Sequence, residues 1–379
     1  MSQRADSSDF PKDTSQRAYF PALDGLRLVS CLLVIVGHSF VFHPLASQML
    51  GLSKMGVHVF FSLSGFLITT LLLREHTSNG RIDLRAFYIR RALRIFPVYY
   101  SAVALSLFLL WLFPLQLSRA FGLSGTWDLA KMAPPLLLFV ANWIPQQLPT
   151  TLDVLWSISV EEQFYLCFPW ALVLSRSRFP ALWPILLGLA LCWATRAVVA
   201  ATSPESIDRN TLATGDHLLF GAVLAHLAHS SPRVASFLFR RGTLSQVGML
   251  GLTFGFALLV PQSPAQHFVR TLVSALLSTG LVATLAFGNG QLGRILALPA
   301  PRFLGQLTYA TYVFHMFAVG VAWWVAAQVT SDVHIAAPLR AALAIPPAFA
   351  LGYVSRVVLE THPLRLKARF SWARASPDG

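Results

Sequence analysis

The chain has 379 residues, of which 55% are hydrophobic and only 12% are charged, and its mean hydropathy is +0.59. Soluble domains carry about 25% charged residues, so this composition excludes a disordered chain and a conventional water-soluble enzyme. The net charge of +13 would suggest nucleic acid in a soluble protein. In so apolar a chain it indicates the positive-inside bias of a membrane protein, or an anionic cytosolic ligand, and no nucleic-acid partner is expected.

Residues 1–25 are polar and lack the apolar core and the cleavage site of a signal peptide. The first apolar run, which begins near Leu26, is therefore predicted to stay in the membrane as an uncleaved anchor. A span needs about 20 mostly apolar residues. An apolar stretch from Ala133 to Ile144 is too short to cross and fits a re-entrant or interfacial helix. Ten segments are long enough and predict an all-α, polytopic transmembrane bundle: 26–43, 57–73, 95–113, 155–174, 181–201, 212–228, 243–260, 268–287, 303–329 and 338–359.

The distribution of Lys and Arg predicts the orientation of this bundle. With the N-terminus in the cytoplasm, 20 of the 29 basic residues fall on inside segments, six fall outside, and Arg27, Arg196 and Arg356 fall within spans. We therefore expect a multi-pass protein of the cytoplasmic membrane with both termini in the cytoplasm. Its expected parts are a polar tail over residues 1–20, one transmembrane domain over 21–362 and a basic tail over 363–379. Cys31, Cys167 and Cys192 lie in apolar runs and are expected to be buried reduced thiols.

Several ionisable residues lie inside predicted spans, where a charge costs about 2.5–3.5 kcal/mol and usually faces the bundle interior for a functional reason. Arg27 and His38 are 11 residues apart, so they project from one face of a helix, about 16 Å apart along its axis. Arg27 is then at the cytoplasmic rim and His38 near mid-depth. Glu161 and His315 are expected within the same slab, which gives the composition of a general acid/base site. A single intramembrane histidine is also often a packing residue, and that alternative stays open.

A basic segment, Phe87-Tyr-Ile-Arg-Arg-Ala-Leu-Arg94, enters the third span. Arg91 and Arg94 are three residues apart and share a helix face, where guanidinium groups suit bidentate phosphate binding. The alternative is a topogenic cluster that contacts lipid headgroups.

The segment Gly56 to Thr69 places small residues within a bulky apolar helix. Ser64 and Gly65 would let another helix, or a thin ligand, approach the backbone closely. Packing is the favoured interpretation, and nothing marks Ser64 as a nucleophile.

Five blocks, in order along the chain, resemble the acyltransferase 3 family of integral-membrane O-acyltransferases. The resemblance implies transfer of an acyl group, usually acetyl from acetyl-CoA, to a hydroxyl of a carbohydrate or another small acceptor. The blocks are Leu23 to His38 with ten residues between its Arg and its His, Gly56–Thr69, Phe87–Tyr100, Leu155–Tyr165 and Leu307–His315. Tyr353–Pro363 resembles the last span of the family.

The resemblance also implies roles for individual residues. His38 would be the essential catalytic histidine, acting as a general base or as an acyl carrier, with Arg27 as its partner in the motif. Arg91 and Arg94 would bind the phosphates of cytosolic coenzyme A, and Arg27 and Ser64 are grouped with them as donor-binding candidates. Glu161 and His315 belong to two further blocks and would orient the imidazole or bind the acceptor.

The predicted function is therefore a bilayer-embedded O-acyltransferase that uses acyl-CoA, needs no metal, and acylates a carbohydrate, a glycolipid or a glycosylated small molecule. Two positions depart from the family pattern, Phe317 in place of a proline and Thr214 in place of an arginine, and no fused extracellular hydrolase-like domain is expected.

The alternative function is a small-solute or proton-coupled transporter that uses the buried charges as a relay. The sequence shows neither an internal repeat nor paired interrupted helices that would favour it. A structural or assembly protein would leave the buried His and Glu unexplained.

Overall fold

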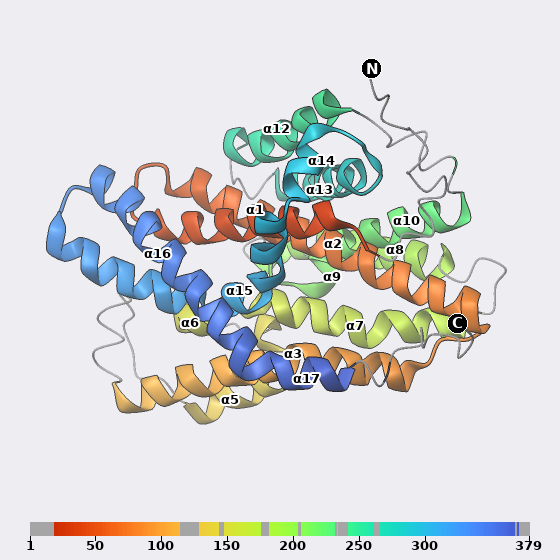
Figure 1. Cartoon of the computed structure of the whole chain (residues 1–379), viewed down its shortest axis with the longest axis horizontal. Helices are drawn as coiled ribbons and strands as arrows, with labels where there is room; N and C mark the ends of the chain where they lie inside the picture. Colours follow the sequence, from red (N-terminus) through yellow and green to blue (C-terminus); the bar gives the residue numbers. More distant parts are fainter. Residues whose placement is uncertain are drawn as a thin grey trace, which may run out of the picture.

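The computed structural model of the protein describes residues 19–113, 129–143, 148–175, 182–203, 206–231, 233, 242–260, 266–367 and 370. Most of the two predicted tails therefore lies outside the described residues. The regular elements in these ranges are helices, and α2, α3 and α7 extend along the long axis of the molecule (Figure 1).

Each of the ten predicted spans corresponds to a helix. Seven helices are long and apolar enough to cross a membrane, namely α1, α2, α3, α8, α13, α15 and the run from α16 to Leu366, and α12 is a shorter apolar helix. The predicted polytopic bundle is thus confirmed, whereas the crossing of α7, α10 and α12 stays a prediction. The ten helices are α1 (Pro21–Ser39), α2 (Ala46–Asn79), α3 (Leu84–Leu112), α7 (Trp156–Leu174), α8 (Leu182–Thr202), α10 (Asp216–Ser230), α12 (Thr243–Leu259), α13 (His267–Phe287), α15 (Pro299–Val329) and α16 (Val333–Ser355).

Short elements connect and extend these helices. A one-residue interruption at Gly215 separates α9 from α10, and a π-helix, η5, continues α16. The short elements are α5 (Leu129–Leu137), the 3-10 helix η2 (Ala141–Trp143), α6 (Thr150–Asp153), α9 (Thr211–Thr214), α14 (Gln291–Leu296), η5 (Arg356–Glu360) and α17 (Thr361–Lys367).

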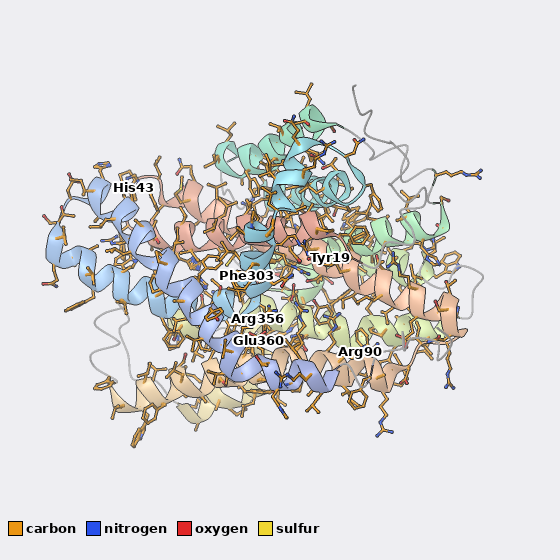
Figure 2. The ribbon with its side chains drawn as sticks, viewed as in Figure 1. Tyr19, His43, Arg90, Phe303, Arg356 and Glu360 are labelled. Atoms are coloured by element: carbon orange, nitrogen blue, oxygen red, sulfur yellow. The ribbon has the colours of Figure 1, made fainter. Side chains whose placement is uncertain are left out.

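His43 and Arg90 lie at opposite ends of the bundle, which are called the His43 end and the Arg90 end (Figure 2). At the His43 end, the α1–α2 connection meets the first turn of α16, where His43 Nε2 lies 3.2 Å from His334 Nδ1. At the Arg90 end, α2 finishes and α3 begins. Glu75 of α2, which is only 1% exposed, accepts a hydrogen bond from Arg90 at 3.1 Å and one from the Asp83 backbone at 2.9 Å.

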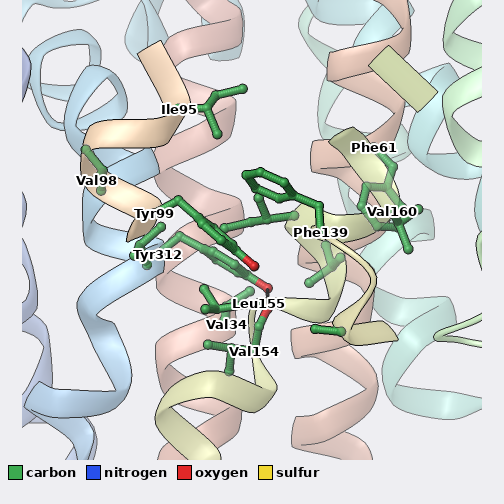
Figure 3. Packing of buried hydrophobic residues seen from close by; sticks show 14 of the residues in the cluster. Val34, Phe61, Ile95, Val98, Tyr99, Phe139, Val154, Leu155, Val160 and Tyr312 are labelled. Carbon is green, nitrogen blue, oxygen red and sulfur yellow. Dashed lines mark hydrogen bonds between the residues drawn. The ribbon is translucent and has the colours of Figure 1, made fainter. Parts of the chain in front are cut away.

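The short apolar stretch expected to be a re-entrant or interfacial helix forms α5 and η2 in its described part, and it lies against α3. The Tyr99 hydroxyl, near the middle of α3, donates a 2.8 Å hydrogen bond to the carbonyl oxygen of Leu136 at the end of α5. Phe139 then turns the chain with a φ of 55° and packs on the Tyr99 ring, with centroids 4.3 Å apart (Figure 3). The chain thus lies beside the middle of α3 before α6 and α7 begin, and this position sets the level in the bundle at which α7 starts.

Small residues let the central helices touch backbone to backbone. A Cβ atom at Gly65 would lie 1.8 Å from the Leu218 carbonyl oxygen, so α2 and α10 are in direct contact there. A Cβ at Gly305 would lie 1.9 Å from the Asp24 carbonyl oxygen, which joins α15 to α1. The close approach expected at Gly65 is therefore helix packing.

The three cysteines do not all have the expected environment. Cys31 and Cys192 are buried, whereas Cys167 is exposed, so the prediction of three buried thiols was wrong for Cys167. The reason is the orientation of α7. Leu166 and Trp170, on the same outer face of this helix, are 60% and 49% exposed, as expected of a face turned toward lipid.

Candidate active site

His38 and His315 come together between α1 and α15. His38 is in the last turn of α1, at the His43 end, and His315 is near the middle of α15. Their ring centroids are 5.2 Å apart and the ring planes are inclined by 50°. His315 is fully buried, and His38 is partly buried. The structure thus makes neighbours of the two histidines that the sequence singled out.

Each of the two imidazoles has one nitrogen atom without a hydrogen-bond partner in the described part of the chain. The Tyr312 carbonyl oxygen, which can only accept, lies 2.5 Å from His315 Nδ1, so Nδ1 carries the hydrogen and a neutral ring leaves a lone pair on Nε2. In the described ranges, neither Nε2 of His315 nor Nδ1 of His38 has a hydrogen-bond partner. A buried polar atom without a partner costs about 1–3 kcal/mol, so such a pair of atoms is best explained by a ligand or a reaction.

Glu161 is held in a second cluster, formed by α2, α3 and α7. Ser64 Oγ donates a 2.8 Å hydrogen bond to Glu161 Oε1, and the Tyr165 hydroxyl lies 3.4 Å from Oε2. The guanidinium of Arg91 lies over the Tyr165 ring, 5.3 Å from its centroid. Arg27 and Arg91 both interact electrostatically with the Glu161 carboxylate. Three predicted residues on three different helices, Arg27, Ser64 and Arg91, therefore interact with the Glu161 carboxylate.

The expected depth of Glu161 was wrong. The sequence placed it in one slab with the two histidines because α7 was taken to start at the membrane surface. In the structure α7 starts inside the bundle, with Trp156 packed edge-on against Phe61, near the middle of α2. Glu161 is consequently in contact with Ser64 rather than with either imidazole.

Tyr312 connects the two clusters. Its ring centroid lies 5.4 Å from that of His315, and its hydroxyl lies 2.6 Å from Ser157 Oγ and 3.1 Å from the Val154 carbonyl oxygen. It also interacts electrostatically with Glu161. Figure 3 shows this tyrosine packed in the same apolar cluster as Tyr99 and Phe139.

Arg27 is fixed by a local acidic residue. Its Nη1 forms a 2.8 Å ion pair with Asp24 Oδ1, and the Tyr19 hydroxyl donates to the other carboxylate oxygen of Asp24. The guanidinium of Arg302 lies over the Tyr19 ring at 5.4 Å. Because Asp24 is 4% exposed, this network holds Arg27 in one orientation.

Arg94 of α3 interacts with a residue of α1 and with a residue of the π-helix η5. It interacts electrostatically with Arg27 and with Glu360, which is 9% exposed and which Figure 2 labels next to Arg356. π-helical turns occur often at functional sites. Guanidinium groups that interact with one another are expected where an anion compensates their charge.

Sequence reasoning missed Tyr165, Tyr312 and Asp24. A helix-spacing rule would have found them, since Tyr165 follows Glu161 by four residues, while Tyr312 and Asp24 precede His315 and Arg27 by three. Within the described ranges, no three His, Cys, Asp or Glu side chains are grouped as ligands of a metal ion would be. The arrangement can therefore offer guanidinium groups to an anion near Arg27 and a basic nitrogen to a hydroxyl at His38.

The curated relatives that match this chain carry the names of known or putative O-acetyltransferases. A peptidoglycan O-acetyltransferase of Listeria monocytogenes is 29% identical over 323 residues, which make up 79% of this chain and 49% of the relative. A putative O-acetyltransferase of Staphylococcus aureus is 27% identical, covering 79% of this chain and 50% of the relative. A putative peptidoglycan O-acetyltransferase of Bacillus subtilis is 29% identical, covering 80% and 49%. The chain spans about half the length of these relatives.

No solved structure was found to match the chain. A family model described as an acyltransferase domain matches residues 20–357, which include both histidines, Glu161 and the arginine cluster. The chain belongs to the acyltransferase 3 family of integral-membrane proteins.

Proposed function

We propose that this chain is an O-acyltransferase that moves an acyl group, acetyl, from cytosolic acyl-CoA to a hydroxyl of a carbohydrate. The observation that carries the proposal is the spatial order of the site. Guanidinium groups gather at Arg27, a carboxylate follows at Glu161, and two imidazoles with unpartnered nitrogens lie about 16 Å from Arg27 along α1. The names of the relatives, which are O-acetyltransferases, support the same reaction.

Coenzyme A fits this order because it joins a polyanionic head to a long, narrow arm that ends in a thioester. In the proposal, Arg27, Arg91 and Arg94 bind the phosphates by charge-assisted hydrogen bonds, and the arm runs toward His38. The cluster at Ser64 and Glu161 lies beside this path. Both termini are cytoplasmic in this orientation, as the distribution of basic residues predicts.

The acyl-transfer step then needs a base at the thioester. An unprotonated imidazole nitrogen of the His38–His315 pair removes the proton of the acceptor hydroxyl, and the hydroxyl oxygen attacks the thioester carbon. The carbon–sulfur bond breaks, the ester forms, and the imidazolium returns the proton to the departing coenzyme A thiolate. The base is regenerated and no further reactant is consumed.

The test is acyl transfer by the purified full chain in lipid nanodiscs, with radiolabelled acetyl-CoA and soluble peptidoglycan fragments or neutral oligosaccharides as acceptors. We expect a labelled ester with the wild type, none with His38→Ala, and normal yield with His43→Ala, a matched histidine on the exposed connection five residues away. A transporter would form no ester with any acceptor. Near-normal turnover by His38→Ala would remove the proposed base.

A further inference from the structure

Three side chains from three segments form a cluster at the His43 end of the bundle (Figure 2). The guanidinium of Arg340, on α16, lies over the ring of Trp323, on α15, with its central carbon 3.7 Å from the ring centroid. Phe42, on the connection beyond the end of α1, packs edge-on against the same ring, with the two centroids 5.0 Å apart. We call these three side chains the Trp323 cluster.

The Trp323 cluster and Arg27 lie on opposite sides of the His38–His315 pair. Trp323 follows His315 by eight residues on α15, which is about 12 Å along the helix axis. Phe42 follows His38 by four residues, whereas Arg27 precedes it by about 16 Å along α1. In the orientation that the basic residues predict, the His43 end is the outer end of the bundle. A second substrate that does not share the path of the donor therefore reaches the imidazoles from the Trp323 cluster.

Arg340 has hydrogen-bonding capacity left for a ligand. Two other basic residues expected on the outer side, Lys54 and Arg209, each form an ion pair with a carboxylate, at 2.5 Å and 2.6 Å. Arg340 instead stacks on an aromatic ring, and its buried Nε has no hydrogen-bond partner in the ranges that the structure describes. A guanidinium stacked in this way keeps its N–H groups free in its own plane, in the fork geometry that matches a carboxylate.

Trp323 differs from the tryptophans of a membrane-interface belt. Such residues place their rings among the lipid headgroups, as expected of the adjacent Trp324, which is 69% exposed. Trp323 is partly buried and packs against the main apolar core of the bundle. Its ring is therefore fixed by the protein, and it holds Arg340 and Phe42 in a defined arrangement.

Phe42 provides an exposed aromatic surface in the same cluster. Its side chain is 69% exposed, although it lies on a polar-rich connection outside the helices. Aromatic rings pack against the C–H faces of sugar rings, while a charged group beside them binds a substituent of the sugar. Phe42 and Arg340, held by one indole, offer these two kinds of contact.

We propose that the Trp323 cluster is the acceptor-binding subsite and that it selects a carbohydrate bearing a carboxylate, with the carboxylate on Arg340 and a sugar ring on Phe42. The inference rests on the proposed function, which supplies the carbohydrate hydroxyl, and it adds the charge of the acceptor. A carboxylate is favoured over a neutral sugar substituent because it accepts two parallel hydrogen bonds from a guanidinium, and charge-assisted bonds are roughly twice as strong as neutral ones.

The test is equilibrium binding of a radiolabelled galacturonic acid trisaccharide to the full chain in phosphatidylcholine nanodiscs, with empty nanodiscs as the blank. The matched ligand is the methyl ester of the same trisaccharide, which keeps the shape and loses the charge. We expect the acid to bind at least about tenfold more tightly than the ester, because the ester lacks the charge-assisted hydrogen bonds. Arg340→Gln should remove this difference and leave the affinity for the ester unchanged.

A second variant tests the aromatic contact. Phe42→Ala should weaken the binding of acid and ester alike, by about threefold to tenfold, because both lose the ring contact. Trp324→Ala is the matched control, since this exposed neighbour of Trp323 is not part of the cluster, and it should leave both affinities unchanged. His334→Gln, at the same end of the bundle, should also have no effect.

Equal affinities of the wild type for acid and ester would overturn the proposal, as would an unchanged preference in Arg340→Gln or an equal loss in Phe42→Ala and Trp324→Ala. Stronger displacement of the acid by glycerol 3-phosphate than by galacturonate would assign the guanidinium to a lipid phosphate and also overturn it. If Arg340→Gln does not fold, as judged by gel filtration and thermal unfolding, the comparison of acid with ester in the wild type still decides. Acyl transfer is measured separately. Selective binding without ester formation would support the subsite and contradict the proposed reaction, and ester formation without selective binding would do the reverse.

Discussion

Ser64 on α2 donates a 2.8 Å hydrogen bond to Glu161 on α7, and this bond joins two sequence blocks that are 97 residues apart. A small hydroxyl residue is required there because the neighbouring Gly65 brings α2 into backbone contact with α10. Ser64 therefore serves two purposes, since it permits close helix packing and it orients a buried carboxylate.

The Ser64→Ala variant should lose this orientation and keep the packing. We expect its acyl-transfer rate to fall by about tenfold, which corresponds to about 1.4 kcal/mol, the size of a hydrogen bond to a charged group. The measurement is kcat with acetyl-CoA at saturation. Ser101→Ala is the matched control, because Ser101 donates only to the Pro97 carbonyl of its own helix. An equal fall in both variants would show that the effect is general.

His315 is expected to act together with His38 in the proton transfer. Glutamine at position 315 preserves a polar side chain but removes the basic nitrogen, so His315→Gln should lower kcat by about 10²–10⁴-fold with little change in the KM for acetyl-CoA. His334→Gln, in the exposed first turn of α16 at the His43 end, should not change kcat. A rise in donor KM alone would place His315 in donor binding instead.

The arginines of α3 should separate into two classes. The Arg91→Ala/Arg94→Ala double variant should raise the KM for acetyl-CoA and make it less dependent on salt, since two phosphate contacts are lost and the remaining attraction is screened less steeply. Steady-state kinetics at several NaCl concentrations test this. Arg90→Ala should lower the melting temperature instead, because Arg90 pairs with the buried Glu75. An unchanged donor KM in the double variant would contradict phosphate binding.

The helices could be predicted from the sequence because each span is a run of apolar residues, which needs no information from distant parts of the chain. The relation between Arg27 and His38 could also be predicted, since both are on one helix and their spacing fixes a shared face. The depths predicted from the sequence place His38 and His315 in one layer of the membrane, but only the packing of α1 on α15 makes them neighbours.

Glu161 could not be placed from the sequence, because its level in the bundle depends on the path of the segment α5–η2 before α7. That path is set by hydrogen bonds from Tyr99 and Tyr100 to the end of α5, which link positions 37 residues apart. The 2.6 Å ion pair between the buried Arg196 and Asp216 was missed for the same reason. Contacts between helices decide both features, and a single sequence carries no signal for such contacts.

The contact between Gly65 and Leu218 predicts a strong dependence of stability on one methyl group. In Gly65→Ala the new Cβ would lie 1.8 Å from a backbone carbonyl oxygen, which cannot rotate away, so α2 and α10 must separate. We expect a loss of about 1–3 kcal/mol or more in the free energy of unfolding, with lower yield of folded protein. Gly255→Ala on α12 has open space and should be neutral or stabilising by up to about 1 kcal/mol. Thermal unfolding of both variants in the same nanodiscs is the measurement, and an unchanged melting temperature for Gly65→Ala would contradict the backbone contact between α2 and α10.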